Sequence, residues 1–183
     1  LSFVYVPLFV VLVNSVNASP TFSWPPPALT TRWWSAAVAN PGVRQATWTS
    51  VQVAARATLI AVVLGTLASM AVARYDFFGR DAVSLFLVLP IALPGIVTGI
   101  ALNSVFTSFF GGLTMLTLVV GHATFCIVVV FNNATARLRR LAGNIEEASM
   151  DLGATRSVTW LRVTFPTLRS SLFAGALLAF GLS

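Results

Sequence analysis

The sequence predicts an all-α protein, a polytopic bundle of transmembrane helices, and three observations lead to this fold class. Hydrophobic residues make up 57% of the 183 residues and charged residues 9%, whereas a soluble domain carries about 25% charged residues. Positions 82–136 contain no charged residue. Most of the charges that do occur lie between positions 137 and 169. Long neutral runs separated by short charged segments are typical of a chain that crosses a bilayer several times.

The net charge of +6 raises the question of a nucleic-acid partner. A nucleic-acid-binding face needs basic residues clustered outside an apolar core, and here they lie between long uncharged runs. We therefore expect no nucleic-acid partner. The one cysteine, Cys126, lies in an apolar run and is interpreted as a small buried hydrophobic residue.

The spans are predicted in chain order, because one spanning helix needs about 20 apolar residues. Residues 1–14 are interpreted as a first span clipped at its N-terminus. A cleaved signal peptide is the alternative, although no basic residue precedes the apolar run. The neutral run holds two helices, because the Gly pair in "NSVFTSFFGG" interrupts helical structure. The remaining spans are expected at residues 53–73, 82–102, 112–131 and, cut short, 168–183.

The arginines indicate which connections face the cytoplasm, since cytoplasmic loops carry an excess of basic residues. With a cytoplasmic N-terminus, the second and fourth connections are cytoplasmic and carry eight of the eleven basic residues and all five acids. This topology gives an extracytoplasmic connection at 15–51, a core domain at 52–183 and, within it, a cytoplasmic loop at 132–167.

The extracytoplasmic connection at 15–51 contains four of the five Trp and the triple proline of "SWPPPAL". Trp prefers the bilayer interface, which predicts a segment lying on the membrane surface. A rigid aromatic surface that binds an external partner is the alternative, and the sequence leaves both open.

Two prolines and two glycines mark the expected span at 82–102. Pro90 and Pro94 each remove a helix hydrogen bond. Gly95 and Gly99 have the four-residue spacing that lets membrane helices approach closely. These residues are candidates either for a structural kink or for lining a substrate pathway.

Other small or polar residues in the spans have structural interpretations. The four-residue spacing recurs at Gly65 and Ser69 and at Gly175 and Ala179, where we expect helices to pack within the bundle. His122 is expected to be a neutral, buried histidine, because nothing nearby supplies the acidic partner of a proton relay. No cluster has metal-ligand spacing, and no Ser, His and acid can meet on one side of the membrane. We therefore expect no metal site and no catalytic residue.

The charged loop is predicted to form a helix, a glycine turn and a second helix. Gly153 ends the first helix, because only Gly adopts a left-handed cap at low cost. Thr155 or Ser157 caps the second helix, and Pro166 stops it before the last span. On the first helix, one side carries Ile145, Ala148, Ser149 and Leu152. Another side carries Glu147 and Asp151, with Glu146 nearby, so the element has an acidic face.

The acids of this loop separate two interpretations of the element. A helix that lies on the membrane surface carries basic residues on its polar face, and acids there would be repelled by anionic lipid. The sequence therefore favours a surface that docks onto a water-soluble protein.

The spacing of this loop resembles the "EAA" loop of bacterial ABC-importer permeases, whose pattern is E-A-A-x3-G-x9-I-x-L-P. It is carried here by Glu147-Ala148-Ser149, by Gly153 and by Val163-x-Phe165-Pro166, with Ser, Val and Phe as departures from the pattern. The surrounding "DLGAT" is also usual for the group, and the resemblance covers the chain from about Gln52 onward. It implies a helical bundle of the type I ABC importer, or MetI-like, kind. It also implies that the loop couples to a separate ATPase through Glu146, Glu147, Ala148, Ser149, Asp151, Gly153, Ala154, Val163 and Pro166.

A narrower resemblance is to the spermidine/putrescine permeases. It rests on "NSVNASPTFSWPPPALTTRWW", "LPIALPGIVTGIAL" and "GHATFCIVVVFNNATARL", and it implies polyamine uptake by alternating access. Family members carry a further helix after "AFGLS", so a sixth span is expected to be missing here. No Asp or Glu lies in a predicted span, so we do not expect this subunit to select a cation by charge.

The resemblance also implies a location and a set of partners. The chain would be a multi-pass protein of the bacterial inner membrane, paired with a second permease subunit, a cytoplasmic ABC ATPase dimer and an extracytoplasmic substrate-binding protein. ATP and Mg²⁺ would bind the ATPase, so this chain would hold no cofactor and would not itself be an enzyme. The alternatives are a permease for ferric ion, thiamine or phosphonate, and a membrane scaffold that transports nothing.

Overall fold

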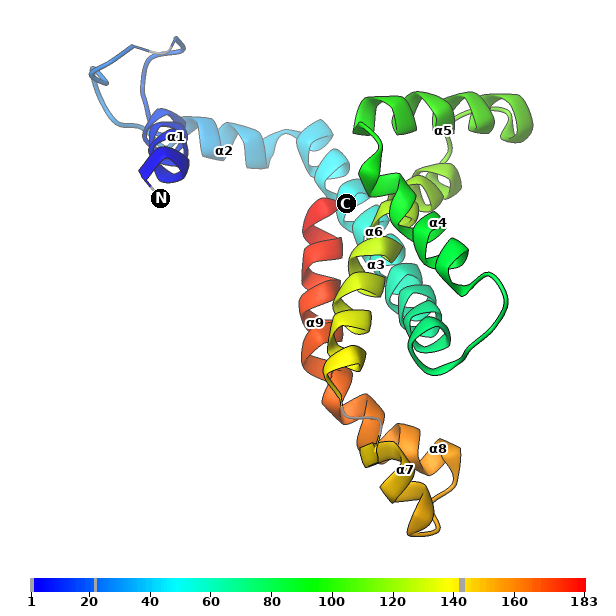
Figure 1. Cartoon of the computed structure of the whole chain (residues 1–183). Coiled ribbons are helices and arrows are strands. Elements are labelled where there is room, and N and C mark those ends of the chain that lie inside the picture. Colours follow the sequence, from blue (N-terminus) through cyan, green and yellow to red (C-terminus); the bar gives the residue numbers. More distant parts are fainter. Residues whose placement is uncertain (1, 22, 142–143) are drawn as a thin grey trace. The chain divides into compact units, whose positions relative to one another are not determined.

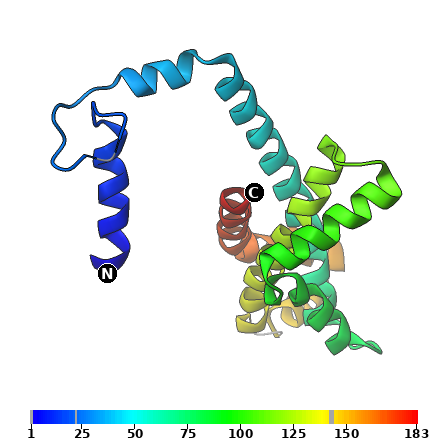
Figure 2. The same cartoon turned by 90° about the horizontal axis from the view of Figure 1, so that it is seen from above.

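The computed structural model describes residues 2–21, 23–141 and 144–183, which are largely helical (Figures 1 and 2). No strand occurs within these ranges, so the predicted all-α class is confirmed. Leu1 of the expected first span, Phe22 of the expected outer connection and residues 142–143 of the expected cytoplasmic loop lie outside the described residues. The helices are α1 (Ser2–Ser15), α2 (Arg32–Ala39), α3 (Pro41–Arg74), α4 (Arg80–Ala92), α5 (Gly95–Phe110), α6 (Met115–Arg140), α7 (Asn144–Asp151), α8 (Arg156–Thr159), the π-helical turn η1 (Trp160–Thr164) and α9 (Phe165–Leu182).

In the part of the chain that the structure describes, 3 helices are long and apolar enough to cross a membrane. They are α3, α6 and the continuous helix that α8, η1 and α9 form over Arg156–Leu182. The pair α4 and α5 would add a fourth if both halves belong to one span, and α1 is a shorter apolar helix. The sequence predicts five spans, and their number remains a prediction.

The chain divides into two compact units, Leu1–Thr49 and Ser50–Ser183. In the first unit, α2 is fixed to the segment that follows α1. The indole Nε1 of Trp33 donates a hydrogen bond to the carbonyl oxygen of the buried Asn17 at 2.8 Å. The guanidinium of Arg32 lies over the Trp33 ring, 4.3 Å from its centroid.

The expected span at 82–102 is not one straight helix. In its place α4 and α5 meet at 97°. Leu93 between them has extended backbone angles, which the residue before a proline prefers because the ring of Pro94 disfavours helical geometry there. Pro90, by contrast, lies inside α4. The structure therefore places the break at Pro94, and α5 continues to Phe110 through the segment expected to be a connection.

Two other helices are longer than expected. The α3 helix begins at Pro41, well before the expected start at 53. The α6 helix begins after Thr114, which forms a capping box with Thr117, and it continues to Arg140 through the first part of the expected loop. Helical backbone satisfies its own hydrogen bonds inside or outside the bilayer, so hydropathy alone does not mark where these helices end.

Pro166 was expected to end a helix, but the helix runs through it. The N–H of Phe165 donates to the carbonyl oxygen of Trp160, five residues earlier, which makes η1 wider than an α-helical turn. A proline ring clashes with the preceding turn and lacks an N–H. The wide turn directly before Pro166 accommodates both effects, because Pro166 occupies the first turn of α9.

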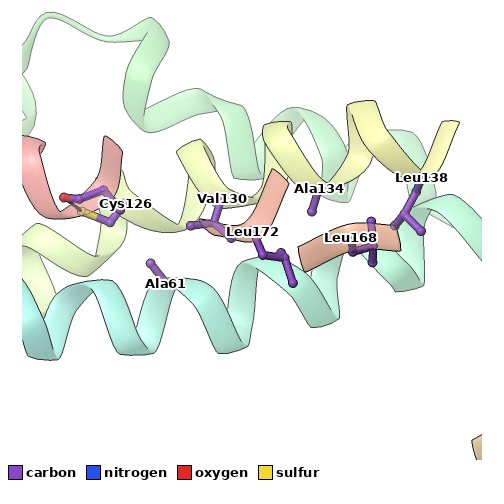
Figure 3. Close-up of a cluster of buried hydrophobic side chains, with 8 residues drawn as sticks. Ala61, Cys126, Val130, Ala134, Leu138, Leu168 and Leu172 are labelled. Atoms are coloured by element: carbon purple, nitrogen blue, oxygen red, sulfur yellow. Dashed lines mark hydrogen bonds between the residues drawn. The ribbon is translucent and has the colours of Figure 1, made fainter. Parts of the chain in front are cut away.

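The core of the second unit lies where α3, α6 and α9 pack together (Figure 3). Gly65, Ser69, Gly175 and Ala179 are all buried there, so the packing predicted from their four-residue spacing is confirmed. Cys126 is 1% exposed, which confirms that it is a buried residue. The cluster consists of Ala61, Cys126, Val130, Ala134, Leu138, Leu168, Leu172 and Ala179.

Candidate functional site

The charged stretch folds as a helical hairpin, which we define as residues Asn144–Thr164. It comprises α7, a glycine turn, α8 and η1. Within the second unit, α7 and α8 lie beyond the ends of α6 and α9 that they connect (Figure 1). The hairpin is therefore a separate projection with a surface of its own.

The first helix of the hairpin ends in a Schellman cap. Gly153 has φ +87°, and its N–H donates to the carbonyl oxygen of Met150 at 2.9 Å. The N–H of Ala154 donates to the carbonyl oxygen of Ser149 at 3.1 Å. Glycine adopts this left-handed geometry without steric cost, so the prediction that Gly153 ends the helix is confirmed.

The second helix begins directly after the turn. Of the two caps that the sequence allows, the structure uses Thr155, whose Oγ1 accepts a hydrogen bond from the N–H of Val158 at 3.4 Å. The hydroxyl oxygens of Ser149 and Thr159 lie 3.1 Å apart and join the two helices. The Thr155 cap, the glycine turn at Gly153 and this hydroxyl pair thus hold the two helices of the hairpin together.

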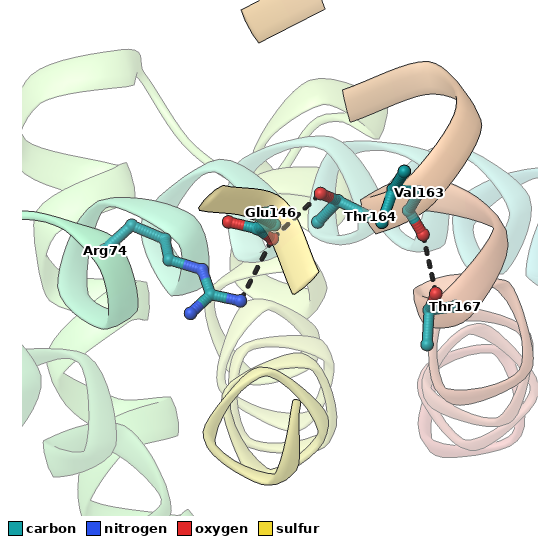
Figure 4. A network of polar contacts seen from close by, with 5 residues as sticks. All are labelled: Arg74, Glu146, Val163, Thr164 and Thr167. Atoms are coloured by element: carbon teal, nitrogen blue, oxygen red, sulfur yellow. Dashed lines mark hydrogen bonds and ion pairs between the residues drawn. The ribbon is translucent and has the colours of Figure 1, made fainter. Parts of the chain in front are cut away.

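Glu146, in the first turn of α7, connects the hairpin to the rest of the second unit (Figure 4). Its Oε1 lies 3.0 Å from Nη2 of Arg74, the last residue of α3. The same oxygen accepts a hydrogen bond from the hydroxyl of Thr164, the last residue of η1, at 2.8 Å. The Arg74 and Glu146 side chains are only 23% and 20% exposed, so water screens this pair less than it would on an open surface.

A second set of polar contacts fixes the start of α9 to α6. The hydroxyl of Thr167 donates to the carbonyl oxygen of Val163 at 2.6 Å (Figure 4). The Nε of Arg137, near the end of α6, donates to the carbonyl oxygen of Thr167 at 3.2 Å. Val163 is half-buried, whereas Pro166 is exposed.

The outer face of α7 is mixed acidic and apolar. Glu147 and Asp151 are exposed, as are Ala148 and Leu152, the last to 89%. Ile145 is exposed to 50%. This face has acids that can pair with basic residues and apolar side chains that can enter a pocket.

One expectation about α7 needs correction. Glu146 does not belong to the exposed acidic face, because Arg74 and Thr164 bind its carboxylate. The physical reason is that α7 turns its polar Glu146 and Ser149 toward η1 and α8, which offer hydroxyl partners.

A cavity of about 400 Å³ lies beside the Arg74–Glu146 pair. Its lining comes from α3, α6 and the hairpin, and includes Tyr75, Leu138 and Trp160. The hairpin therefore does not pack tightly against the ends of α3 and α6 at this place. The Arg74–Glu146 pair and the packing of Trp160 against the core cluster both connect the hairpin there.

The structure does not bring the proline and glycine candidates near the hairpin. Pro94 precedes α5, and Gly95 is the first residue of that helix. A Cβ added at Gly95 or at Gly99 would meet nothing within 4 Å. These residues mark the bend between α4 and α5, and their part in a pathway remains a prediction.

Sequence reasoning missed Arg74 and Thr164, the two partners of Glu146. Arg74 lies 72 positions from Glu146 along the chain, so no local spacing could reveal the pair. The sequence did contain a partial indication that the two residues could meet. Arg74 is the last residue of a long apolar helix, and Glu146 lies in the first turn of a short helix. The described residues contain no group of three His, Cys, Asp or Glu that could hold a metal ion.

Comparisons with known proteins place the chain in a family. No family model matches it. The putrescine transport system permease protein PotI of Escherichia coli K12 is 32% identical over 190 residues, which cover 100% of this chain and 67% of the relative. The spermidine/putrescine transport system permease protein PotC of the same strain is 31% identical, covering 100% of this chain and 69% of the relative. The sulfate transport system permease protein CysT of Salmonella typhimurium is 32% identical over 161 residues, covering 81% and 58%. The chain therefore belongs to the family of ABC-importer permeases, in the branch that contains the putrescine and spermidine/putrescine permeases.

Proposed function

We propose that this chain is part of a bacterial inner-membrane permease that imports a polyamine such as putrescine or spermidine, driven by a separate ATPase. The observation that carries the proposal is the projecting helical hairpin, which presents Glu147 and Gly153 beyond the ends of α6 and α9, with Pro166 following in the first turn of α9 (Figure 1). Relatives that match the whole chain are named for polyamine transport, while the sulfate permease matches a smaller share of it.

The hairpin would seat in a groove of the cytoplasmic ATPase. Its outer face combines the exposed Leu152 and Ile145 with the exposed acids Glu147 and Asp151. Protein interfaces commonly bury apolar anchors at their centre and leave polar residues at the rim. This face has that composition, and its exposed residues act together as one docking surface.

The orientation of the chain follows from its arginines. Arg74 is in the last turn of α3, and Arg137, Arg139 and Arg140 are in the last turn of α6. Basic residues favour both the cytoplasmic side of a membrane and the negative end of a helix dipole. These arginines support a cytoplasmic location for the ends of α3 and α6 near the hairpin, and we propose a cytoplasmic N-terminus as well.

The mechanism is alternating access. Closure of the ATPase dimer around ATP moves the hairpin, and the hairpin tilts the helices attached to it. The ATPase, with ATP and Mg²⁺, supplies the chemistry, and this chain converts the movement into opening on one side of the membrane. A second permease subunit completes the translocation path.

Selection of the polyamine is assigned mainly to an extracytoplasmic binding protein. A polyamine carries several positive charges, and a site that selects it by charge needs carboxylates. All five acids of the chain are Asp76, Asp81, Glu146, Glu147 and Asp151. None of them lies in α3, α6 or α9, and Asp81 lies in the first turn of α4.

A cysteine crosslink tests the docking surface. Ala148 on the exposed face of α7 is replaced by Cys in a Cys126→Ala background, and membranes are treated with a thiol crosslinker in the presence of the ATPase. We expect a crosslink whose yield changes with ATP. Ser108→Cys, an exposed position on α5, is the matched control and should give none. Equal crosslinking at both positions would favour a scaffold without a specific ATPase contact.

An uptake measurement tests the substrate. Proteoliposomes that contain the assembled transporter and its binding protein should accumulate radiolabelled putrescine or spermidine when ATP is enclosed with the ATPase. Ferric ion, thiamine and phosphonate should not accumulate under the same conditions. Uptake of one of these in place of a polyamine would support the permease function but overturn the assignment of a polyamine as its substrate.

A further inference from the structure

We propose that the Glu146 carboxylate is a joint that transmits movement of the helical hairpin to α3, with Arg74 and Thr164 as its two other members. The proposal rests on the proposed function and deepens it. It assigns a positioning role to residues that lie behind the docking surface and do not reach the ATPase.

The geometry of the joint connects three elements through one oxygen atom. Oε1 of Glu146 on α7 lies 3.0 Å from Nη2 of Arg74 on α3 and 2.8 Å from the hydroxyl of Thr164 on η1 (Figure 4). Hydrogen bonds that involve an ionised partner are shorter and stronger than neutral ones. A displacement of α7 therefore pulls on α3 and on the start of the last helix at the same time.

The ion pair joins α7 directly to the end of α3. The α7 helix packs on α8 and η1, both of which belong to the hairpin itself. The cavity of about 400 Å³ lies at the place where α3, α6 and the hairpin meet. The ion pair lies at the edge of this cavity, and Trp160 of the hairpin packs against the core cluster. The polar contact is the link through which α7 itself passes its movement to α3.

The third member, Thr164, lies at the point where the helix is deformable. Thr164 ends the π-helical turn η1, and Pro166 follows two residues later. Turns of this kind interrupt the regular hydrogen-bond ladder and are places where helices bend. A hydrogen bond from Thr164 to Glu146 sets the angle at which the hairpin meets α9.

A second ion pair in the same unit, between Arg80 and Asp76, does not join distant helices. Arg80 and Asp76 approach to 2.6 Å, but the Asp76 side chain is 96% exposed and the pair lies one helical turn apart in the chain. Exposed pairs of this type contribute little, and this one connects no two distant elements. The Arg80–Asp76 pair is therefore the matched control for the joint.

The test measures how much polyamine is transported for each ATP hydrolysed by the assembled transporter in proteoliposomes. Glu146→Gln keeps the size of the side chain and removes its charge. We expect the transported amount per ATP to fall about fivefold or more, the range of ordinary coupling between sites, while the ATPase still co-purifies. Asp76→Asn should leave the ratio unchanged. A purely structural role would lower assembly, ATP hydrolysis and transport together, and would leave the ratio unchanged.

A rescue experiment covers the case in which Glu146→Gln fails to assemble. Arg74→Cys and Glu146→Cys are combined in a Cys126→Ala background, and a bifunctional methanethiosulfonate reagent joins the two thiols. The reduced protein should be uncoupled, and the crosslinked protein should recover most of its transport per ATP. Each single Cys variant treated with the same reagent should not recover.

Three outcomes decide between the hypotheses. A wild-type transporter without polyamine-dependent ATP hydrolysis would overturn the proposed function itself. A coupled wild type, together with an equally coupled Glu146→Gln or an equally coupled reduced double-Cys protein, would overturn the joint alone. Loss of coupling without recovery on crosslinking would also overturn it, since a covalent link between positions 74 and 146 replaces the connection that the ion pair supplies.

Discussion

A Cβ atom built on Gly65 of α3 would lie 3.0 Å from the carbonyl oxygen of Ile127 on α6. The Cβ of Val130 and the backbone N of Phe131 would be equally close, at 3.0 and 3.1 Å. Two of these three atoms belong to the backbone, which cannot rotate away. The two helices are therefore in direct backbone contact at Gly65, the arrangement that small residues permit in membranes.

The first prediction is that Gly65→Ala destabilises the protein. The added methyl group must push α3 and α6 apart, and overpacking of this kind costs about 1–3 kcal/mol, more than the gain of about 1 kcal/mol that Ala brings to a helix. A lowered midpoint of thermal unfolding in detergent would show it. Gly175→Ala is the control, because its Cβ would lie 3.4 Å from Cα of Val130, an ordinary contact, and it should be tolerated. Equal midpoints for the two variants would contradict the packing.

The second prediction concerns the thiol of Cys126. It is 1% exposed and lies 3.3 Å from the carbonyl oxygen of Ala179. A thiol reacts as an exposed thiolate, so maleimide should label Cys126 only after denaturation in sodium dodecyl sulfate. Cys introduced at the exposed Ser108 should be labelled in the native protein. Rapid native labelling of Cys126 would show that α6 and α9 separate readily, and it would make the Cys126→Ala background necessary in every crosslinking experiment.

The third prediction distinguishes an effect of Glu147 on ATPase docking from its effect on the stability of its own helix. Glu147 lies in the first turn of α7 and Asp81 in the first turn of α4, where each acid favours its helix through the dipole by about 0.3–1 kcal/mol. Glu147→Arg and Asp81→Arg therefore carry a similar helix cost. We expect only Glu147→Arg to weaken co-purification of the ATPase and to abolish ATP-driven uptake. If both variants lose uptake equally, the loss reflects folding and not the docking surface.

Local rules in the sequence predicted much of the hairpin. Gly153 and Thr155 act where the spacing places them, because caps depend on residues within a few positions of each other. The packing of a helix at Gly65 and Ser69 could be predicted for the same reason, because their four-residue spacing is also a short pattern. These signals are short in sequence, and the structure satisfies each of them.

Long-range effects could not be predicted in the same way. The pairing of Arg74 with Glu146 depends on where α3 ends relative to α7, which no local pattern records. The continuation of the helix through Pro166 required a π-helical turn, a backbone adjustment that competes with the usual helix-stop signal of proline. A kink was one of the two interpretations of Pro94, but the angle of the bend depends on how α5 leaves α4, and the sequence does not encode that angle locally.

The last prediction is that Gly153→Ala uncouples transport although it changes only one methyl group. Gly153 has φ +87°, and a residue with a Cβ in left-handed geometry costs about 1–2 kcal/mol. The cap would loosen, Ala154 and Ser149 would lose their hydrogen bond, and the angle between α7 and α8 would change. Gly111, which ends α5 with φ +75°, is the matched control, since Gly111→Ala carries the same backbone cost at another helix end. Measured in proteoliposomes, transport per ATP should fall for Gly153→Ala and stay near wild type for Gly111→Ala. The reverse order would place the sensitive turn between α5 and α6 and remove the hairpin from the coupling path.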